Sequence, residues 1–383
     1  MTADHRNLIS KTDVAVRRRY SAAAREREHA LCCPVDYDPR YLKVIPQAVL
    51  DRDYGCGDPS RYVREGDTVL DLGSGAGKIC FIASQIVGPK GSVVGVDMND
   101  EMLSLAHTSA PQVAEAVGYA NVQFHRARIQ DLALDLDALD AWLTDHPVLG
   151  VEGLTALEEE RARLRRTYPL VPDASVDLVV SNCVLNLVRE SDRRQLVEEI
   201  FRVLKAGGRI AISDIVSDEE VPEELKADPE LWSGCVSGAF QELELLRALE
   251  DAGFYGIAID KWEPEPFAVV EGIEFRSVTI TAHKGKQGAS LDAHEAVIYR
   301  GPWRAVEDDA GHRLVRGERT AVDSGTFGIL NAEPYATEIV ALAPRTDATP
   351  VAYDCCRDRL RHPRETKGTD YRETRKPGGG SCC

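Results

Sequence analysis

Short apolar runs alternate with helical patterns between residues 67 and 216, and this alternation limits the fold more than any other feature. Buried strands are predicted at residues 68–72, 92–96, 121–125, 176–180 and 209–215. Helices are predicted at residues 78–87, 99–117 and 192–204. Strands that alternate with helices of this length form βαβ units around a parallel sheet. We therefore expect a doubly wound α/β core with helices on both faces and a ligand crevice at the carboxyl ends of the strands.

The regions on either side of this core differ from it in composition. A chain of 383 residues is long enough for about two or three domains. We expect an N-terminal segment over residues 1–65, a core over 66–284 and a smaller C-terminal α+β domain over 285–383. Residues 284–290 have the composition of a linker. The charged tail from Arg361 ends in GGGSCC, which predicts a flexible end.

Further elements are predicted at the borders of the core. A helix is expected at residues 241–252, and a closing strand at 275–283. An insertion occupies residues 136–172, and within it residues 154–166 form a charged amphipathic pattern. We interpret that pattern as a solvated surface helix or lid.

The acidic balance of the chain narrows the choice of partners. Its formal net charge is −17, whereas proteins that bind nucleic acid usually present a basic face to the phosphates. We therefore expect a small-molecule substrate and no nucleic-acid partner. No apolar run approaches the ~18 residues of a membrane span, and residues 1–20 lack the apolar stretch of a secretory signal. The expectation is a cytoplasmic protein with no membrane partner.

Three glycines mark a ligand loop. Gly73, Gly75 and Gly77 follow the first strand and open the first helix of the core. Without Cβ atoms the backbone can turn tightly and let a ligand approach closely. The spacing G-x-G-x-G differs from the G-x-G-x-x-G of a dinucleotide loop, and no Lys-Ser/Thr pair follows to make a P-loop. NAD binding stays open as an alternative for the loop alone.

Two carboxylates beside the glycine loop also indicate a ligand site. Asp71 precedes the glycines and could pair with the amino group of a methionine moiety. Asp97 ends the next strand, roughly 20 residues beyond the glycines, where an acidic residue usually takes a ribose hydroxyl. Strand, glycine loop and second carboxylate together predict a cofactor site at this edge of the sheet.

This arrangement resembles class I methyltransferases that use S-adenosylmethionine (SAM), over roughly residues 54–284. The resemblance implies a Rossmann-like core, with Met98 near the adenosine and Ala127, Arg128 and Ile129 flanking the adenine. Ser181 and Asn182 are implied at the methionine end. The predicted cofactor residues are Tyr54, Asp71, Gly73, Ser74, Gly75, Gly77, Asp97, Met98, Arg128, Ile129, Ser181 and Asn182.

Ten cysteines are unusual for a cytosolic chain, where thiols are metal-binding, catalytic or idle. Cys56, Cys183 and Cys235 lie in predicted loops that can converge on the mouth of the site, and Cys80 lies in an apolar run that predicts core packing. The absence of a C-x-x-C pair gives a structural zinc site little support. Thiolates favour soft ions, and trivalent arsenic or antimony would take three of them. Three vicinal pairs complete the set: Cys32 and Cys33, Cys355 and Cys356, Cys382 and Cys383.

Several of these segments together resemble arsenite methyltransferases. The resemblance rests on CCP from Cys32, on residues 45–57, on the DLGSG loop, on SNCVLNL from Ser181 and on the SGC loop around Cys235. The C-terminal unit and the final cysteine pair look like bacterial members. The insertion at residues 136–172 is longer than this family predicts, and Cys355 and Cys356 have no role to carry over.

The resemblance implies a mechanism. Cys56, Cys183 and Cys235 would bind As(III), whose lone pair attacks the methyl group without a general base. Cys32 or Cys33 would then form a disulfide with Cys56 that returns arsenic to the trivalent state. A thiol reductant, thioredoxin or glutathione, would reset the enzyme.

Two other functions stay open at this point. A SAM methyltransferase acting on an organic small molecule would usually need a base, for which His125 and His146 are available. A thiol-rich metalloid-binding protein could use SAM only as a ligand. Arsenite-stimulated conversion of SAM to S-adenosylhomocysteine is expected only of the arsenite methyltransferase.

Overall fold

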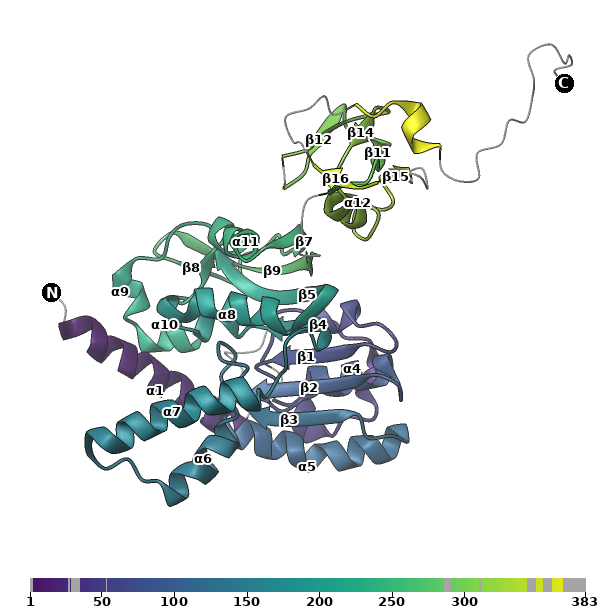
Figure 1. Cartoon of the computed structure of the whole chain (residues 1–383). Coiled ribbons are helices and arrows are strands. Elements are labelled where there is room, and N and C mark those ends of the chain that lie inside the picture. Colours follow the sequence, from purple (N-terminus) through teal and green to yellow (C-terminus); the bar gives the residue numbers. More distant parts are fainter. Residues whose placement is uncertain are drawn as a thin grey trace, which may run out of the picture. The chain divides into compact units, whose positions relative to one another are not determined.

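The structure is a computed structural model of the chain (Figure 1). It describes residues 3–26, 28, 35–52, 54–285, 291–309, 311–342, 349–353 and 360–367, with residues 3–13 as backbone only. The chain forms two compact units, Met1–Lys284 and Gly285–Cys383, so the N-terminal segment belongs to the same unit as the core. The three vicinal cysteine pairs and the glycine-rich end of the tail lie outside the described residues.

One large sheet organises the first unit, in the order β3-β2-β1-β4-β5-β9-β7. The first five strands of this sheet run parallel to one another, and β9 runs antiparallel to both of its neighbours. The chain leaves the β3 edge and re-enters beside β1, which makes the β1–β4 junction the switch point where ligands bind in such sheets. The main strands are β1 (Thr68–Leu72), β2 (Ser92–Asp97), β3 (Val122–Arg126), β4 (Val176–Asn182), β5 (Leu204–Ser217), β7 (Phe254–Trp262) and β9 (Ile273–Lys284).

Alternate residues of each strand bury opposite faces of the sheet, as the two-residue period of a strand requires. Leu70 and Val179 pack in the cluster that α8 (Glu190–Val203) and α11 (Glu242–Asp251) cover. Val69 and Leu178 pack in the cluster under α4 (Lys78–Val87) and α5 (Asp100–Val117). Helices therefore cover both faces, and the predicted doubly wound fold is confirmed.

Several elements of this unit were not predicted. They include the long N-terminal helix and the antiparallel strand β7. No helix within the described ranges is long and apolar enough to cross a membrane. The additional elements are α1 (Ala3–Arg25), α2 (Pro39–Leu42), α3 (Gln47–Leu50), α9 (Glu223–Lys226), α10 (Pro229–Ser233), β6 (Phe240–Gln241), β8 (Ala268–Val270) and short 3-10 helices at Pro59–Tyr62 and Leu185–Leu187.

The insertion is a helical hairpin of α6 (Leu136–Asp145) and α7 (Gly150–Thr167), which extends from the β3 edge in Figure 1. A small cluster that includes Leu139 and Leu164 joins the two helices. Arg165 binds the Asp131 carboxylate through both Nε and Nη2 and so anchors the base of the hairpin. Most of α7 is exposed, since only two of its residues are buried: Glu160 and Leu164.

The second unit consists of small antiparallel sheets around a core that includes Val297, Leu314 and Val322. One helix packs with them, so the predicted α+β character is confirmed. Its elements are β10 (Leu291–Asp292), β11 (Ala296–Tyr299), β12 (Ala305–Glu307), β13 (Arg313–Val315), β14 (Arg319–Ala321), α12 (Ser324–Leu330), β15 (Ile339–Leu342), β16 (Val351–Ala352) and a 3-10 helix at Pro363–Thr366.

A buried ion pair is expected to stabilise the first unit. Arg209 of β5 donates to the Asp67 carboxylate just before β1, and both residues are 9% exposed. Asp67→Ala should lower the free energy of unfolding by about 3–5 kcal/mol, because it leaves a buried guanidinium without its counter-charge. Urea unfolding measures the loss.

The matched control is an exposed ion pair on α8. Arg194 and Glu198 are 90% and 54% exposed in their side chains, so Glu198→Ala should cost at most about 0.5 kcal/mol. Equal losses in the two variants would contradict the assignment of the Asp67–Arg209 pair as a stabilising contact.

Candidate cofactor and thiol site

A cavity of about 380 Å³ opens at the carboxyl ends of the parallel strands. Of the predicted cofactor residues, Gly77 and Ser181 do not line it. Ser181 is fully buried beneath, and its hydroxyl has no hydrogen-bond partner among the described residues. The predicted residues that line the cavity are Tyr54, Asp71, Gly73, Ser74, Gly75, Asp97, Met98, Ala127, Arg128, Ile129 and Asn182.

The glycine loop is fixed by the strand next to it. The backbone N–H groups of Gly73 and Ser74 donate to Val96 O at 2.8 and 3.0 Å. A Cβ at Gly73 would lie 2.5 Å from the Val184 side chain, so only glycine lets the loop pass the segment after β4. At Gly77 (φ +90°) a Cβ would lie 2.6 Å from Phe124. Gly77 therefore allows the close packing of α4 on β3.

Asp97 links the glycine loop to the second strand. Its Oδ2 accepts from Gly75 N at 2.8 Å and its Oδ1 from Asn99 N at 2.8 Å. Burial raises the pKa of this carboxyl, while the backbone N–H bonds lower it. Each carboxylate oxygen has a second lone pair. Asp97 can therefore accept a hydrogen bond from the hydroxyl of a ligand in the cavity while it keeps its hydrogen bonds to the backbone.

Asp71 is the buried carboxyl at the end of β1. It is 2% exposed, and the Cys80 thiol donates to its Oδ2 at 3.1 Å. Burial raises the pKa of Asp71 to about 7, with the Cys80 bond lowering it and the charge of Asp97 raising it. Cys80 is fully buried, as core packing requires, but it also orients this carboxyl. Sequence reasoning missed that contact.

These groups fit SAM. Within the described ranges Asp71 forms no ion pair, so its carboxylate can take an ammonium group. The buried Ser74 hydroxyl, which lines the cavity, has no hydrogen-bond partner among the described residues. A Cβ at Gly75 would meet nothing within 4 Å. The site therefore offers a carboxylate, a hydroxyl and open backbone to an amino acid joined to a nucleoside.

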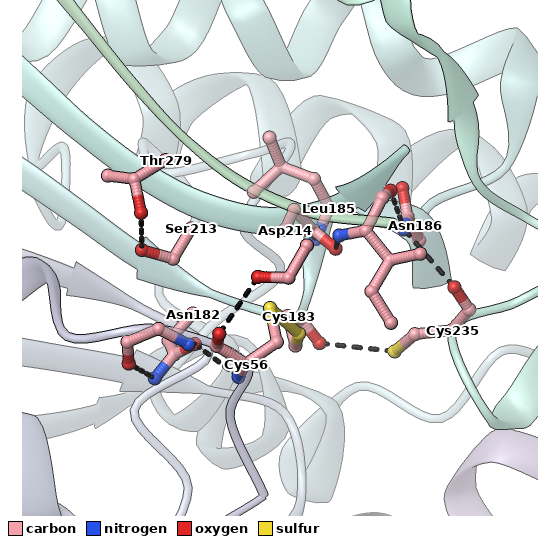
Figure 2. The surroundings of a disulfide bond; sticks show 12 residues. Cys56, Asn182, Cys183, Leu185, Asn186, Ser213, Asp214, Cys235 and Thr279 are labelled. Atoms are coloured by element: carbon pink, nitrogen blue, oxygen red, sulfur yellow. Dashed lines mark hydrogen bonds between the residues drawn. A yellow bond between two sulfur atoms is a disulfide. The ribbon is translucent and has the colours of Figure 1, made fainter. Parts of the chain in front are cut away.

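Three cysteines meet beside this cavity (Figure 2). Cys56 and Cys183 form a disulfide with their Cα atoms 6.0 Å apart. Cys235 lies outside that disulfide, and its Sγ donates to Cys183 O at 3.2 Å. All three belong to one buried cluster. In this oxidised form the described residues contain no group of three or more His, Cys, Asp or Glu placed to hold a metal ion.

The disulfide in the structure is one that the resemblance does not imply. The resemblance implies that Cys56 pairs with Cys32 or Cys33 during turnover, whereas the structure joins Cys56 to Cys183. Cys32 and Cys33 lie outside the described residues. Cys56 bonds to Cys183 because the Cys56 turn is held against the end of β4, and this places it beside Cys183.

Asn182 holds that turn. Its Oδ1 accepts from Cys56 N at 2.9 Å and from Gly57 N at 3.1 Å, and its Nδ2 donates to Gly57 O at 2.8 Å. A Cβ at Gly55 would lie 2.1 Å from the Asn182 Nδ2. Asn182 thus faces the cavity, as the resemblance implies, and also clamps the chain around Cys56.

Cys183 and Cys235 both have left-handed backbone, with φ of 57° and 61°. Non-glycine residues rarely adopt this region, and the surroundings must hold them there at a cost of ~1–3 kcal/mol each. Such strain is typical of functional sites. Both thiols are therefore presented by backbone that the fold forces into place.

Asp214 supports the turn at Cys183. Its Oδ2 accepts from Leu185 N at 2.9 Å and its Oδ1 from Ile215 N at 2.8 Å. Burial raises the pKa of Asp214 to about 7, and these backbone bonds lower it. Sequence reasoning missed Asp214, although a carboxyl inside the apolar strand β5 is an available signal.

The raised pKa of Asp71 predicts that the affinity for the cofactor depends on pH. With its pKa at about 7 in the ligand-free protein, the carboxyl is mostly protonated below that pH and cannot pair with an ammonium group. SAM affinity should rise with pH through about 7 and then level off, by up to about tenfold per pH unit on the acid side. Calorimetric titration from about pH 6 to about pH 8 measures this. Asp71→Asn should bind weakly without the trend, and a flat wild-type profile would refute the assignment.

Comparison with known proteins finds matches for both units. Residues 64–253 match a family model described as a methyltransferase domain. Residues 286–371 match a model described as a domain of unknown function, DUF8838. The methyltransferase family implies SAM as the cofactor, so NAD is removed as an alternative for the glycine loop.

Relatives with established names cover most of the chain. It is 32% identical to an arsenite methyltransferase of Aquipseudomonas alcaligenes, over 80% of this chain and 82% of the relative. It is 30% identical to the arsenite methyltransferase of Homo sapiens, over 82% and 77%. An arsenic(III) S-adenosylmethionine methyltransferase from Chlamydomonas reinhardtii has a crystal structure that matches with a TM-score of 0.55 and 25% identity, over 84% of this chain and 100% of that one. The chain belongs to the arsenite methyltransferase family.

Proposed function

We propose that this chain transfers a methyl group from SAM to trivalent arsenic held by the sulfurs of Cys56, Cys183 and Cys235. The main support is the grouping of these three residues in one buried cluster, with Cys183 also lining the cofactor cavity. The strained backbone at Cys183 and Cys235 adds to it. The names of the relatives supply the substrate class.

In this proposal the cavity residues bind the methyl donor. When bound, SAM supplies a methyl group on a sulfonium centre. The Asp71 carboxylate pairs with the ammonium group, and Asp97 accepts a ribose hydroxyl. The glycine loop lets the backbone approach closely. Asn182 orients the Cys56 turn at the same edge of the cavity.

Arsenic needs positioning more than acid–base chemistry. Three thiolates leave the lone pair of As(III) available as the nucleophile, and this nucleophile carries no proton to remove. Holding the two reactants at near-attack distance can contribute ~7–11 kcal/mol. The Cys183 and Cys235 loops supply that positioning, because Asp214 accepts from Leu185 N beside the Cys183 turn and Asn186 Nδ2 donates to Cys235 O.

The disulfide fits the redox balance of the reaction. Methyl transfer takes As(III) formally to As(V), and two thiolates that form a disulfide return the two electrons. The Cys56–Cys183 bond has the form of such an oxidised state. A thiol reductant, thioredoxin or glutathione, then breaks that bond and restores both thiols. Cys32 or Cys33 stays in the proposal as a further redox cysteine.

The organic-substrate alternative loses the two histidines that the sequence offered as a base. Neither His125 nor His146 is among the residues that line it. Burial lowers the pKa of His125, and His146 stacks on Trp142 with its Nδ1 at the Trp142 carbonyl. A protein that only binds metalloid and SAM would form no S-adenosylhomocysteine. A turnover assay therefore distinguishes this alternative from a methyltransferase.

Serine variants test the proposal on reduced protein. Cys183→Ser and Cys235→Ser should each lower arsenite-dependent formation of S-adenosylhomocysteine on the order of 100-fold, the loss that a misplaced reactant causes. A serine oxygen is a hard ligand and holds a soft centre poorly. Cys56→Ser should lose turnover with arsenite but keep part of it with methylarsenite, which needs two protein thiolates.

The control is SAM binding and thermal unfolding of each variant, which should match the wild type. A folded Cys183→Ser or Cys235→Ser variant that turns over arsenite at the wild-type rate would eliminate the thiolate mechanism. A methyltransferase for an organic substrate would then be the better explanation.

A further inference from the structure

The C-terminal half of α1 connects the two sides of the site. Towards the cofactor, Ser21 Oγ donates to Glu101 Oε2 at 2.8 Å and accepts from Asn99 Nδ2 at 3.1 Å. Towards the thiols, Arg19 Nη1 donates to Glu230 O at 3.0 Å and to Ser233 Oγ at 3.2 Å. The Arg19 contacts lie on α10, which ends two residues before Cys235. The residue between Arg19 and Ser21 is therefore fixed from both sides.

That residue is Tyr20, which also lines the cofactor cavity. Its hydroxyl lies 3.7 Å from Cys235 Sγ, and its ring meets Tyr54 edge-on at 6.4 Å between centroids. Burial raises the pKa of Tyr20 well above its ordinary value, and the neighbouring Cys235 raises it further. The phenol therefore keeps its proton and can act as a hydrogen-bond donor.

The Cys235 sulfur accepts this hydrogen bond from Tyr20 both as a thiol and when it binds arsenic. In the thiol form the S–H donates to Cys183 O, so the sulfur accepts from Tyr20. When arsenite binds, an As–S bond forms, an As–O bond breaks, and the thiol proton leaves with the hydroxide as water. The sulfur then has no proton for Cys183 O, but it still accepts from Tyr20. Arsenic takes the place of that proton, on the side of Cys183.

We propose that Tyr20 is a positioning residue for the third arsenic ligand: its hydroxyl donates to the Cys235 sulfur and holds it towards Cys183 and the cavity. This inference rests on the proposed function. It assigns to α1 a part in binding the substrate, because Tyr20 reaches Cys235 only while Arg19 and Ser21 keep the helix in place.

The test is Tyr20→Phe in the full-length, reduced protein, since it removes the hydroxyl and keeps the ring. The KM for arsenite should rise roughly tenfold, which is at the low end for a hydrogen bond to a charged group. The acid limb of kcat/KM for arsenite should move up by about one pH unit, since the thiolate loses a donor. The Kd for SAM and the melting temperature should stay at the wild-type values. If Tyr20 only supported the fold, its loss would lower the melting temperature and would not change the arsenite kinetics selectively.

Tyr119→Phe is the matched control. It also removes a tyrosine hydroxyl with a hydrogen bond, to Ser84 O at 3.3 Å, and Ser84 belongs to α4. This variant should keep both the KM and the pH profile.

Cys235→Ser, measured in parallel, distinguishes the two failures. If it is inactive while Tyr20→Phe has wild-type KM and pH profile, the role of Tyr20 is wrong and the thiolate set stands. If Tyr20→Phe weakens SAM binding and leaves the KM for arsenite unchanged, Tyr20 belongs to the cofactor site and the inference is also wrong. If Cys235→Ser is fully active with arsenite, the proposed function fails.

Discussion

The carboxamide of Asn182 joins parts of the chain that are 125 residues apart. As the last residue of β4 it stands at the switch point of the sheet, and its oxygen and nitrogen bind both N–H and C=O groups of the Cys56 turn. An amide can do this because it is a donor and an acceptor at once, whereas a carboxylate could only accept. Without this clamp the N-terminal segment would not bring Cys56 to Cys183, and the thiols and the cofactor cavity would not share an edge.

The predictable parts of this structure are those that depend on neighbouring residues. β1 and the glycine loop were predictable because strand period, turn and helix start follow one another locally. β7 (Phe254–Trp262) was not, since five consecutive residues at its exposed end show no alternation of burial. In the site, Cys183 and Cys235 could be singled out by their loops, but the partner of Cys56 could not. The disulfide, the Asp214 bonds and the Tyr20 contact all join distant residues, and no spacing in the sequence reports them.

Two buried carboxyls show why a raised pKa does not by itself identify a ligand site. Burial raises the pKa of both Asp71 and Asp214 to about 7. Asp214 is surrounded by backbone N–H groups, so its acceptor capacity serves the fold. Among the described residues Asp71 accepts from the Cys80 thiol alone, and it faces the cavity. The two carboxyls differ in the groups that already bind them. Asp214 therefore serves the backbone, and Asp71 is left to bind a cation.

The disulfide between Cys56 and Cys183 also closes a covalent ring, since the two residues are 127 apart in sequence. That ring contains β1, β2 and β3 and the helical hairpin of α6 and α7. A ring of this size removes conformational freedom from the unfolded chain worth ~5 kcal/mol in the chain-entropy description. Reduction of the site opens the ring. The electrons that prepare the cysteines for arsenic therefore also release half of the sheet from its tether, and the form ready for substrate is the less stable one.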